Sequence, residues 1–307
     1  MINRVLIRLK VIQIVYAYYK NSGKSLKAAE DEVFFSLSKA YDLYNHMLLL
    51  MPAITHYAAD RISFLKTKMR HSDGTSGPDT RFVDNRFIAQ LEKDAQLVKF
   101  AEKSKLNWVD HSDFLRRMLD EIEASDFFAE YMASEKLSFE DDKELWRKIY
   151  KTFIFDNEEL DSILEEQSLY WNDDKSIVDT FVLKTIKRFE EGGEGMHQLL
   201  PEYKDVADMD FAGKLFRNAI TNAEEYRAMM AASSKNWDMS RLAFMDVVIM
   251  QVALAEVMAF DDIPLSVTLN EYVEIAKHYS TVKSGSFVNG LLDSITKKLR
   301  EENKINK

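Results

Sequence analysis

The sequence predicts an all-α protein, and three observations carry that prediction. Only 9 Gly and 4 Pro occur in 307 residues, so few positions can form the turns between β-strands. Hydrophobic residues make up 46% of the chain, enough for one large core or two modest ones. Apolar residues recur at three- and four-residue spacing along most of the chain, which is the period of an amphipathic helix. The absence of Cys excludes disulfides and thiolate metal sites.

The first predicted helix covers about residues 3–19 and ends at the polar stretch 21–23, a typical C-terminal signal. A second helix follows from about Ser25, and Pro52 is expected to kink or end it. The polar stretch 71–80 is the clearest predicted loop. The core positions expected in these two helices are Val5, Ile12, Val15, Tyr19, Val33, Leu37, Tyr41, Tyr44 and Leu48.

From about residue 82 to residue 200 the sequence continues helical and acidic, with apolar stripes but no pattern that indicates chemistry. The glycine-rich stretch 190–195 and Pro201 then mark a boundary. Residues 241–260 are almost entirely apolar, which predicts a helix buried on nearly all sides. A turn at 261–264 separates it from a second, amphipathic helix. A last helix with a core stripe is expected after the polar loop 280–285.

The formal net charge is −10, which is unfavourable for binding nucleic acid because phosphate contacts need Lys and Arg. The charge is unevenly distributed, however. Residues 120–175 hold eighteen Asp or Glu against six Lys or Arg, whereas residues 1–29 hold six basic residues and no acidic one. A basic N-terminal helix and a basic C-terminal tail can therefore form a local positive face. The alternative is that these charges belong to ordinary solvated helix faces.

Several segments resemble the NusB family of bacterial transcription antitermination factors. They read R-L-A-F-M-D, A-L-A-E-V, D-D-I-P, N-E-Y-V-E-I-A-K and S-G-S-F-V-N-G-L-L-D, and together they cover roughly residues 205–300. The N-terminal segment N-R-V-L-I-R-L-K-V-I-Q-I-V-Y is similar to the arginine-rich first helix of the family. The resemblance implies an all-α, NusB-like fold of two packed helix bundles. Because the family is about half as long as this chain, the N-terminal part would be enlarged by a helical insertion.

Three regions follow from this resemblance. Residues 1–50 would be the NusB-like N-terminal helices, and residues 205–307 the NusB-like C-terminal helical half. Residues 51–204 would be a helical acidic insertion or an extension of the N-terminal bundle. We favour an extension, because no linker rich in Pro and Ser bounds the segment on both sides.

Candidate RNA-binding residues lie first in the N-terminal helix. Arg4 and Arg8 are one helical turn apart, so both guanidinium groups could reach a single RNA strand, and Lys10 could support them. The resemblance implies RNA contact here, although apolar residues 5–7 stand where the family often has a run of arginines. Tyr16 could stack on an unpaired base. The alternatives are two ordinary surface arginines and a core tyrosine.

Further candidates lie in the C-terminal half. By the same resemblance, Phe287 of F-V-N-G lies near the RNA face, or alternatively closes the start of the last helix. Lys283 replaces an acidic residue common in the family, so its charge could offset the missing arginines. Asp246 and Glu256 interrupt the apolar helix, and the resemblance implies that acidic positions there contact a protein partner. Asp246 is the stronger candidate, and a buried salt bridge is the alternative. Gly290 is expected to permit close helix packing.

No catalytic or metal site is predicted. Residues 23–25 (Gly-Lys-Ser) imitate the end of a phosphate loop, but Tyr18 stands where the earlier glycine is required, and no strand precedes it. The six histidines include no pair four residues apart, and no carboxylate is suggestively placed beside one. We therefore expect no enzymatic activity and no cofactor.

The resemblance implies a factor that binds boxA-type single-stranded RNA together with the NusE-like small-subunit ribosomal protein. The pair would act in the transcription elongation complex and support ribosomal RNA transcription. Two alternatives stay open: a protein-interaction module without RNA binding, and a remnant of the RNA-binding domain attached to certain RNA methyltransferases. We expect a cytoplasmic protein with no membrane contact, because charged residues interrupt both the N-terminal apolar stretch and the buried helix.

Overall fold

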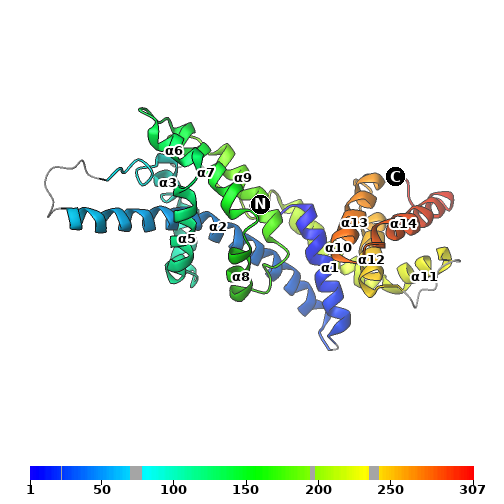
Figure 1. Ribbon diagram of the computed structural model, residues 1–307. Helices are drawn as coiled ribbons and strands as arrows, with labels where there is room; N and C mark the ends of the chain where they lie inside the picture. Colours follow the sequence, from blue (N-terminus) through cyan, green and yellow to red (C-terminus); the bar gives the residue numbers. More distant parts are fainter. Residues whose placement is uncertain (22, 70–77, 194–197, 235–241) are drawn as a thin grey trace. The chain divides into compact units, whose positions relative to one another are not determined.

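The computed structural model describes residues 1–21, 23–69, 78–193, 198–234 and 242–307, and within these ranges every regular element is a helix (Figure 1). The predicted all-α fold class is confirmed. The chain divides into two compact units: unit 1 comprises Met1 and residues 39–202, and unit 2 comprises residues 2–38 and 203–307. The helix α2 (Leu26–Met69) begins in unit 2 and ends in unit 1. The expected region boundary at 204/205 lies near the division at 202/203, whereas the one at 50/51 falls inside α2.

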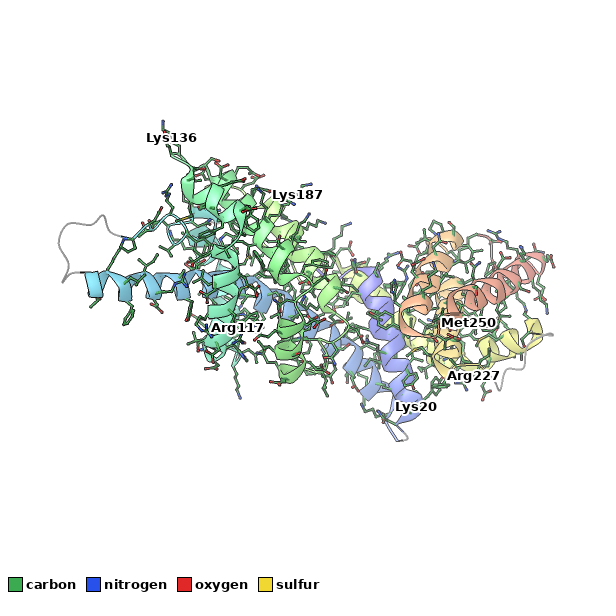
Figure 2. All side chains as sticks on the ribbon, in the orientation of Figure 1. Lys20, Arg117, Lys136, Lys187, Arg227 and Met250 are labelled. Atoms are coloured by element: carbon green, nitrogen blue, oxygen red, sulfur yellow. The ribbon has the colours of Figure 1, made fainter. Side chains whose placement is uncertain are left out.

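Unit 2 is organised around one helix that is buried on nearly all sides. Its helices are α1 (Arg4–Lys20), the first part of α2, α10 (Val206–Thr221), α11 (Ala223–Ser233), α12 (Phe244–Ala259), α13 (Leu265–Tyr279) and α14 (Ser284–Glu301). The central helix is α12, which contacts α1, α10, α11, α13 and α14 (Figure 1). Met250 in its middle is fully buried, whereas Lys20 at the end of α1 is exposed (Figure 2). The core helix predicted within the apolar run is therefore observed as α12, Phe244–Ala259.

Side-chain caps explain where two of these helices begin. The Asn3 side chain accepts a hydrogen bond of 2.9 Å from the backbone N–H of Leu6 at the start of α1. The Asp205 side chain accepts one of 3.0 Å from the N–H of Asp208 at the start of α10. Both bonds satisfy a backbone donor that the first helical turn leaves without a partner. The helix α1 ends at Lys20, immediately before the polar stretch predicted to stop it.

Unit 1 is a bundle of shorter helices packed on the second part of α2. They are α3 (Arg86–Leu91), α4 (Ala95–Lys103), the 3-10 helix η1 (Trp108–His111), α5 (Ser112–Glu123), α6 (Asp126–Ala133), α7 (Phe139–Ile149), the π-helical turn η2 (Tyr150–Ile154), α8 (Glu158–Gln167) and α9 (Lys175–Arg188). The helix α7 contacts α3, α6, α9 and η2, and its Trp146 is fully buried. The acidic segment of the sequence thus has a core of its own.

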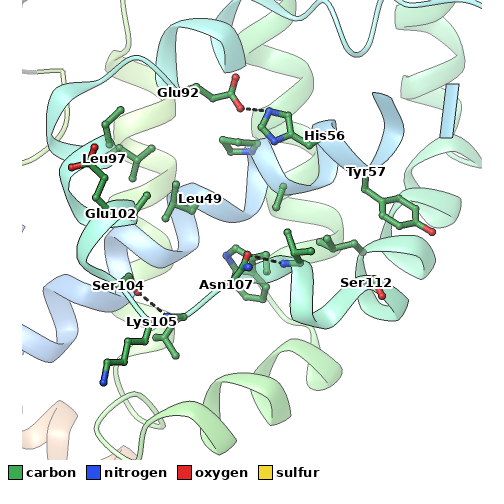
Figure 3. A pocket seen from close by; sticks show the side chains of 18 of the residues that line it. Leu49, His56, Tyr57, Glu92, Leu97, Glu102, Ser104, Lys105, Asn107 and Ser112 are labelled. Atoms are coloured by element: carbon green, nitrogen blue, oxygen red, sulfur yellow. Dashed lines mark hydrogen bonds and ion pairs between the residues drawn. The ribbon is translucent and has the colours of Figure 1, made fainter. Parts of the chain in front are cut away.

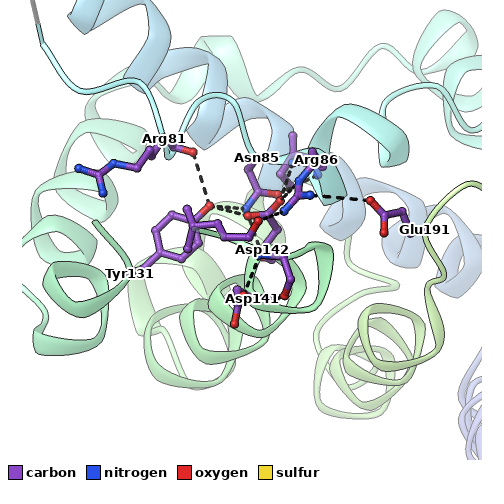
Figure 4. Close-up of polar contacts among 10 residues, drawn as sticks. Arg81, Asn85, Arg86, Tyr131, Asp141, Asp142 and Glu191 are labelled. Carbon is purple, nitrogen blue, oxygen red and sulfur yellow. Dashed lines mark hydrogen bonds and ion pairs between the residues drawn. The ribbon is translucent and has the colours of Figure 1, made fainter. Parts of the chain in front are cut away.

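A buried carboxylate near the start of α7 joins three elements of unit 1 (Figure 4). Asp142 accepts hydrogen bonds from the Tyr131 hydroxyl at 2.7 Å and from Arg86 Nε at 2.8 Å. The backbone N–H of Arg86 also donates to this carboxylate at 3.1 Å, and Asn85 Nδ2 donates to the Asp142 carbonyl at 3.2 Å. These bonds connect α7 to α6 and to the start of α3. Paired and hydrogen-bonded in this way, the carboxylate can remain buried.

Two expectations about breaks in the chain differ from the structure or lie outside it. The helix α2 does not end at Pro52, which was one of the two outcomes expected there. Proline removes one helical hydrogen bond, but the flanking Met51 and Ile54 are fully buried, so packing holds the helix together. The predicted loop 71–80 lies outside the described residues except for its last three positions.

Candidate nucleic-acid interface

Arg8 lies in the core of unit 2 and forms a bidentate ion pair with Glu256. Arg8 Nε and Nη2 donate to the two Glu256 oxygens at 2.7 and 2.8 Å. The same carboxylate accepts hydrogen bonds from Thr268 Oγ1 at 2.8 Å and from the Tyr272 hydroxyl at 3.0 Å. Arg8 Nη1 also lies 3.6 Å from Glu271. The pair therefore connects α1, α12 and α13 through four hydrogen bonds to one carboxylate.

The environment of this pair keeps the Arg8 guanidinium charged. Burial disfavours the charged guanidinium, but the hydrogen bond and the negative charge of Glu256 outweigh it, so the pKa of Arg8 is raised. Burial and the Glu256 charge also raise the pKa of Tyr272 well above its usual value, which keeps its hydroxyl a donor. An arginine held bidentately suits this role because its planar fork matches the carboxylate.

The positions of Arg8 and Glu256 correct two expectations. Their side chains are 3% and 0% exposed, so neither presents a surface to RNA or to a protein partner. Instead, Arg8, which was expected to contact RNA, pairs with Glu256, which was expected to contact a protein partner and lies 248 residues away in sequence. The alternative interpretation of an acidic residue on the apolar helix, a buried salt bridge, holds for Glu256. The reason is that the face of α1 carrying Arg8 packs against α10 and α12.

Arg4 and Lys10 differ in exposure although both come from the basic N-terminal helix. The Arg4 side chain is 37% exposed, lies 5.0 Å above the Phe211 ring, and forms ion pairs with Asp208 at 3.5 Å and Asp262 at 3.9 Å. Lys10 is only 2% exposed. Because Lys10 follows Arg8 by two residues, it points from the opposite side of the helix and cannot support it. The expectation of Lys10 as a surface RNA contact is therefore corrected as well.

Tyr16 belongs to a half-exposed group of rings and cations that we call the aromatic–cation cluster. It consists of Tyr16, Tyr19 and Lys20 from α1, Arg227 from α11 and Phe244 from α12. The Tyr16 and Phe244 rings lie 5.3 Å apart, and Lys20 Nζ lies 4.6 Å from the Phe244 centroid and 5.6 Å from that of Tyr16. The Arg227 guanidinium lies 4.6 Å from the Tyr19 ring. Cations at these distances are attracted to the ring faces.

Sequence reasoning found only Tyr16 of this cluster. The positions of Tyr19 and Lys20, three and four residues beyond Tyr16, were a readable signal, since such residues share a helix face. Arg227 and Phe244 could not be found in this way, because they come from helices more than 200 residues away in sequence. Gln251 of α12 donates to the Tyr19 hydroxyl at 2.8 Å and helps to fix the cluster.

Asp246 is buried and connects α12 to the start of α14. It accepts a hydrogen bond of 2.9 Å from Ser284 Oγ, which in turn accepts one of 3.0 Å from the Thr281 N–H. The expectation of Asp246 as a surface contact is therefore corrected, and its partner is a hydroxyl rather than a cation. Lys283, immediately before α14, is exposed and Phe287 is half-buried. Gly290 is exposed, and an added Cβ would meet nothing within 4 Å, so it does not serve close packing.

Other kinds of site find no support in the part of the chain that is described. No group of three or more metal-binding side chains occurs there. None of the described helices is at once long enough and apolar enough to cross a membrane.

Residues 180–297 match the family model described as the NusB family. The chain is also similar to three curated proteins named transcription antitermination protein NusB. The one from Salinibacter ruber is 34% identical over 132 residues, which are 41% of this chain and 82% of that protein. The one from Geotalea daltonii is 34% identical over 137 residues, 44% and 91% of the two chains. The one from Chloroherpeton thalassium is 36% identical over 111 residues, 36% and 53%. No solved structure matches the chain significantly.

Proposed function

The chain belongs to the NusB family, and from that premise we propose that unit 2 binds boxA-type single-stranded RNA together with a NusE-like small-subunit ribosomal protein. The assembly acts within the transcription elongation complex in the cytoplasm. It serves as a transcription antitermination factor for ribosomal RNA and catalyses no reaction.

The observation that carries this proposal is the aromatic–cation cluster. Single-stranded RNA is held by aromatic side chains that stack on unpaired bases, and by cations that neutralise nearby phosphates. Tyr16 supplies a partly exposed ring, and Lys20 lies over two ring faces of the cluster. The cluster contains two cations and no carboxylate. At one nucleotide, the ring can therefore stack on the base while the neighbouring cation binds the phosphate.

Three further residues extend the proposed RNA-binding surface of unit 2. Arg4 is partly exposed, but its two ion pairs with Asp208 and Asp262 compete with phosphate. Lys283 is exposed and Phe287 half-buried at the start of α14. Asp246 acts indirectly, because its bond to Ser284 holds the start of that helix. The acidic core residues thus position the surface rather than contact a partner.

A second candidate function is a protein-interaction module that does not bind RNA. The burial of Arg8 and Lys10 favours it, because two of the three α1 cations expected to contact RNA are not available to phosphate. The two candidates differ in salt dependence, since neutralised phosphates make RNA affinity fall steeply as salt is raised.

The test is fluorescence anisotropy of a labelled boxA-like RNA with the full chain, with and without the NusE-like ribosomal protein of the same organism, across a salt series. The proposal expects salt-sensitive binding that tightens with the partner and weakens for Lys20→Gln. Lys136→Gln, an exposed lysine of unit 1, is the matched control (Figure 2). Formation of the protein complex without any RNA binding would instead support the interaction module.

A further inference from the structure

Unit 1 contains an open groove outside the residues that match the family model. It lies between α2, α4 and the segment from Ser104 to the start of α5, and has a volume of about 650 Å³ (Figure 3). We call it the α2–α4 groove. Its α2 wall extends from Leu49 to Asp60, which at 1.5 Å per residue is roughly 17 Å, or about three helical turns.

The inner surface of the groove is apolar. Trp108 is buried at its base, where its ring stacks on His46 at 4.3 Å and its Nε1 donates to the His46 carbonyl at 2.9 Å. Val98 and Val109 at the edge are 41% and 68% exposed, which is a large exposure for apolar side chains. The other apolar lining residues include Leu49, Pro52, Ala53, Leu97, Leu106 and Leu115. Covering exposed apolar surface of this kind with a partner is energetically favourable, because it removes the surface from water.

The loop that forms one wall is held by its own side chains. Ser104 Oγ accepts from the Leu106 N–H at 3.1 Å, and Asn107 Oδ1 accepts from the Val109 N–H at 3.0 Å (Figure 3). These bonds satisfy two backbone donors within the wall. What the wall offers a ligand is therefore mainly the apolar faces of its side chains.

The charged residues of the groove are mostly acidic. Asp60, Glu92 and Glu102 line it, and Glu92 pairs with His56 at 2.5 Å. Lys105 is the one Lys or Arg among the described lining residues, and Figure 3 shows its side chain directed away from the others. Unit 1 as a whole carries 33 Asp or Glu against 22 Lys or Arg. An apolar surface with carboxylates around it is complementary to apolar residues flanked by Lys or Arg.

We propose that the α2–α4 groove binds a basic amphipathic helix of a protein partner, with apolar residues at three- and four-residue spacing inserted and Lys or Arg facing the carboxylates. RNA does not fit, because the carboxylates repel phosphates. A second copy of unit 1 would bring together two surfaces with the same excess of acid. The basic C-terminal residues of the chain are engaged within unit 2, where Lys307 donates to the Phe260 carbonyl and Lys304 pairs with Glu302, so they are not the proposed occupant.

The test uses a fluorescent Leu/Lys peptide of about three turns, with Leu at helical spacing, titrated by the full chain at about 0.15 M salt. One comparison peptide has the same composition in scrambled order. The other has Glu in place of every Lys. Ala101→Arg places a large cation in the groove, and Ala129→Arg places one on the exposed surface of α6 as the matched control. Circular dichroism shows whether each variant remains folded and whether the peptide becomes helical.

The proposal expects the Leu/Lys peptide to bind more tightly than both comparison peptides. Ala101→Arg should weaken binding about tenfold or more, and Ala129→Arg less than about twofold. The double variant Asp60→Asn with Glu102→Gln should weaken it more than Glu121→Gln with Glu166→Gln, two exposed carboxylates elsewhere in unit 1.

Equal effects of the two arginine substitutions, or equally tight binding of the Glu peptide, would overturn the proposal. Two other outcomes would assign the groove to another occupant. Binding of a labelled oligouridylate that is lost in Ala101→Arg would indicate RNA. Self-association in sedimentation velocity that is lost in the same variant would indicate a second copy. None of these results depends on whether unit 2 binds boxA-type RNA.

Discussion

Unit 1 and unit 2 each contain a buried carboxylate that binds an arginine and a tyrosine hydroxyl. In unit 2, Glu256 accepts from Arg8 and Tyr272, and in unit 1, Asp142 accepts from Arg86 and Tyr131. The carboxylates are similarly buried, but the Arg8 side chain is 3% exposed and that of Arg86 is 45% exposed. The same pairing chemistry therefore places one arginine in the core and leaves the other partly in water.

This difference shows that an arginine on a basic helix is available to a ligand only if it is not already buried in an ion pair within the protein. Arg8 lies on the face of α1 that packs against the rest of unit 2, so its charge is neutralised inside the fold. Arg86 keeps part of its guanidinium at the surface, where it also lies 3.8 Å from Glu191. Counting arginines on a helix thus overestimates the charge that RNA can meet.

The two units also differ in net charge. Unit 1 holds 33 acidic residues against 22 basic ones, whereas unit 2 holds 18 against 19. The acidic balance of the chain therefore belongs to unit 1 alone, and unit 2 is close to neutral. A whole-chain charge of −10 consequently does not argue against RNA binding by unit 2.

The largest effect expected is the loss of the buried carboxylate in unit 2. Glu256→Ala should destabilise unit 2 by about 3–5 kcal/mol, because it leaves Arg8 charged and buried without its partner. Asp142→Ala should cost unit 1 less, because Arg86 can turn to solvent. Hydrogen exchange of the α12 and α7 amides, measured for both variants, checks the comparison. Equal losses of protection in the two units would contradict it.

A double variant separates the charge from the packing. Arg8→Met combined with Glu256→Met removes both charges while keeping most of the buried volume. We expect it to be more stable than Glu256→Ala, because no unpaired charge remains in the core. If the double variant were instead less stable than Glu256→Ala, an unpaired buried charge would not be the main cost of losing Glu256.

The next effect concerns acid stability, which we expect to differ between the units. Burial lowers the pKa of His46 in unit 1 to about 4, whereas His278 of unit 2 is exposed. His46 binds a proton below pH 6.5 when unfolded but only near pH 4 when folded. Its contribution is therefore present above pH 6.5 and lost as the pH falls to 4, by up to about 3 kcal/mol.

Replacing His46 with Phe removes this titration while keeping a ring between Trp108 and Trp171. The variant should lose less stability than the wild type between pH 6.5 and 4, measured by urea unfolding with tryptophan fluorescence. Asp179, whose pKa burial raises to about 6, acts in the opposite direction but is common to both proteins. Parallel pH profiles for the two proteins would count against the role of His46.

A smaller effect is expected from removing one stacking ring. Tyr16→Leu should weaken boxA-like RNA binding by about 1–3 kcal/mol, because Leu cannot stack on a base. Phe153→Leu changes a half-buried ring of unit 1 and should leave RNA binding unchanged. Anisotropy titrations at one salt concentration decide between them. Equal affinity for the Tyr16 variant and the wild type would exclude Tyr16 from the RNA surface.

The smallest effect is expected from reversing a surface charge. Lys283→Glu should weaken RNA binding modestly and reduce the slope of log affinity against log salt by about one, because one phosphate contact is lost. Lys136→Glu makes the same change in unit 1 and should alter neither quantity. If the two variants behaved alike at low salt, the effect would be one of overall charge.

Sequence reasoning correctly predicted the elements with a strong local pattern. The apolar run at 241–260 could only be a core helix, and Asn21 follows the observed end of α1. It left open whether α2 ends at Pro52, and the helix continues because burial of the flanking residues outweighs the local effect of one proline. The expected surface position was wrong for four candidate residues, because Arg8, Lys10, Asp246 and Glu256 are all buried. A polar residue on a mostly apolar helix can be exposed at the surface or buried with a polar partner, and periodicity does not distinguish these two cases.

The sequence by itself determined the all-α fold class, the buried central helix of unit 2, the acidic character of the middle segment and the resemblance to one family. These depend on spacing and composition, which act over a few residues or over the whole chain. Only the tertiary structure decided that Arg8 meets Glu256 from 248 residues away, and that Tyr16 gains Phe244 beside it. Burial and pairing depend on which helix faces meet, and that is set by packing between segments distant in sequence.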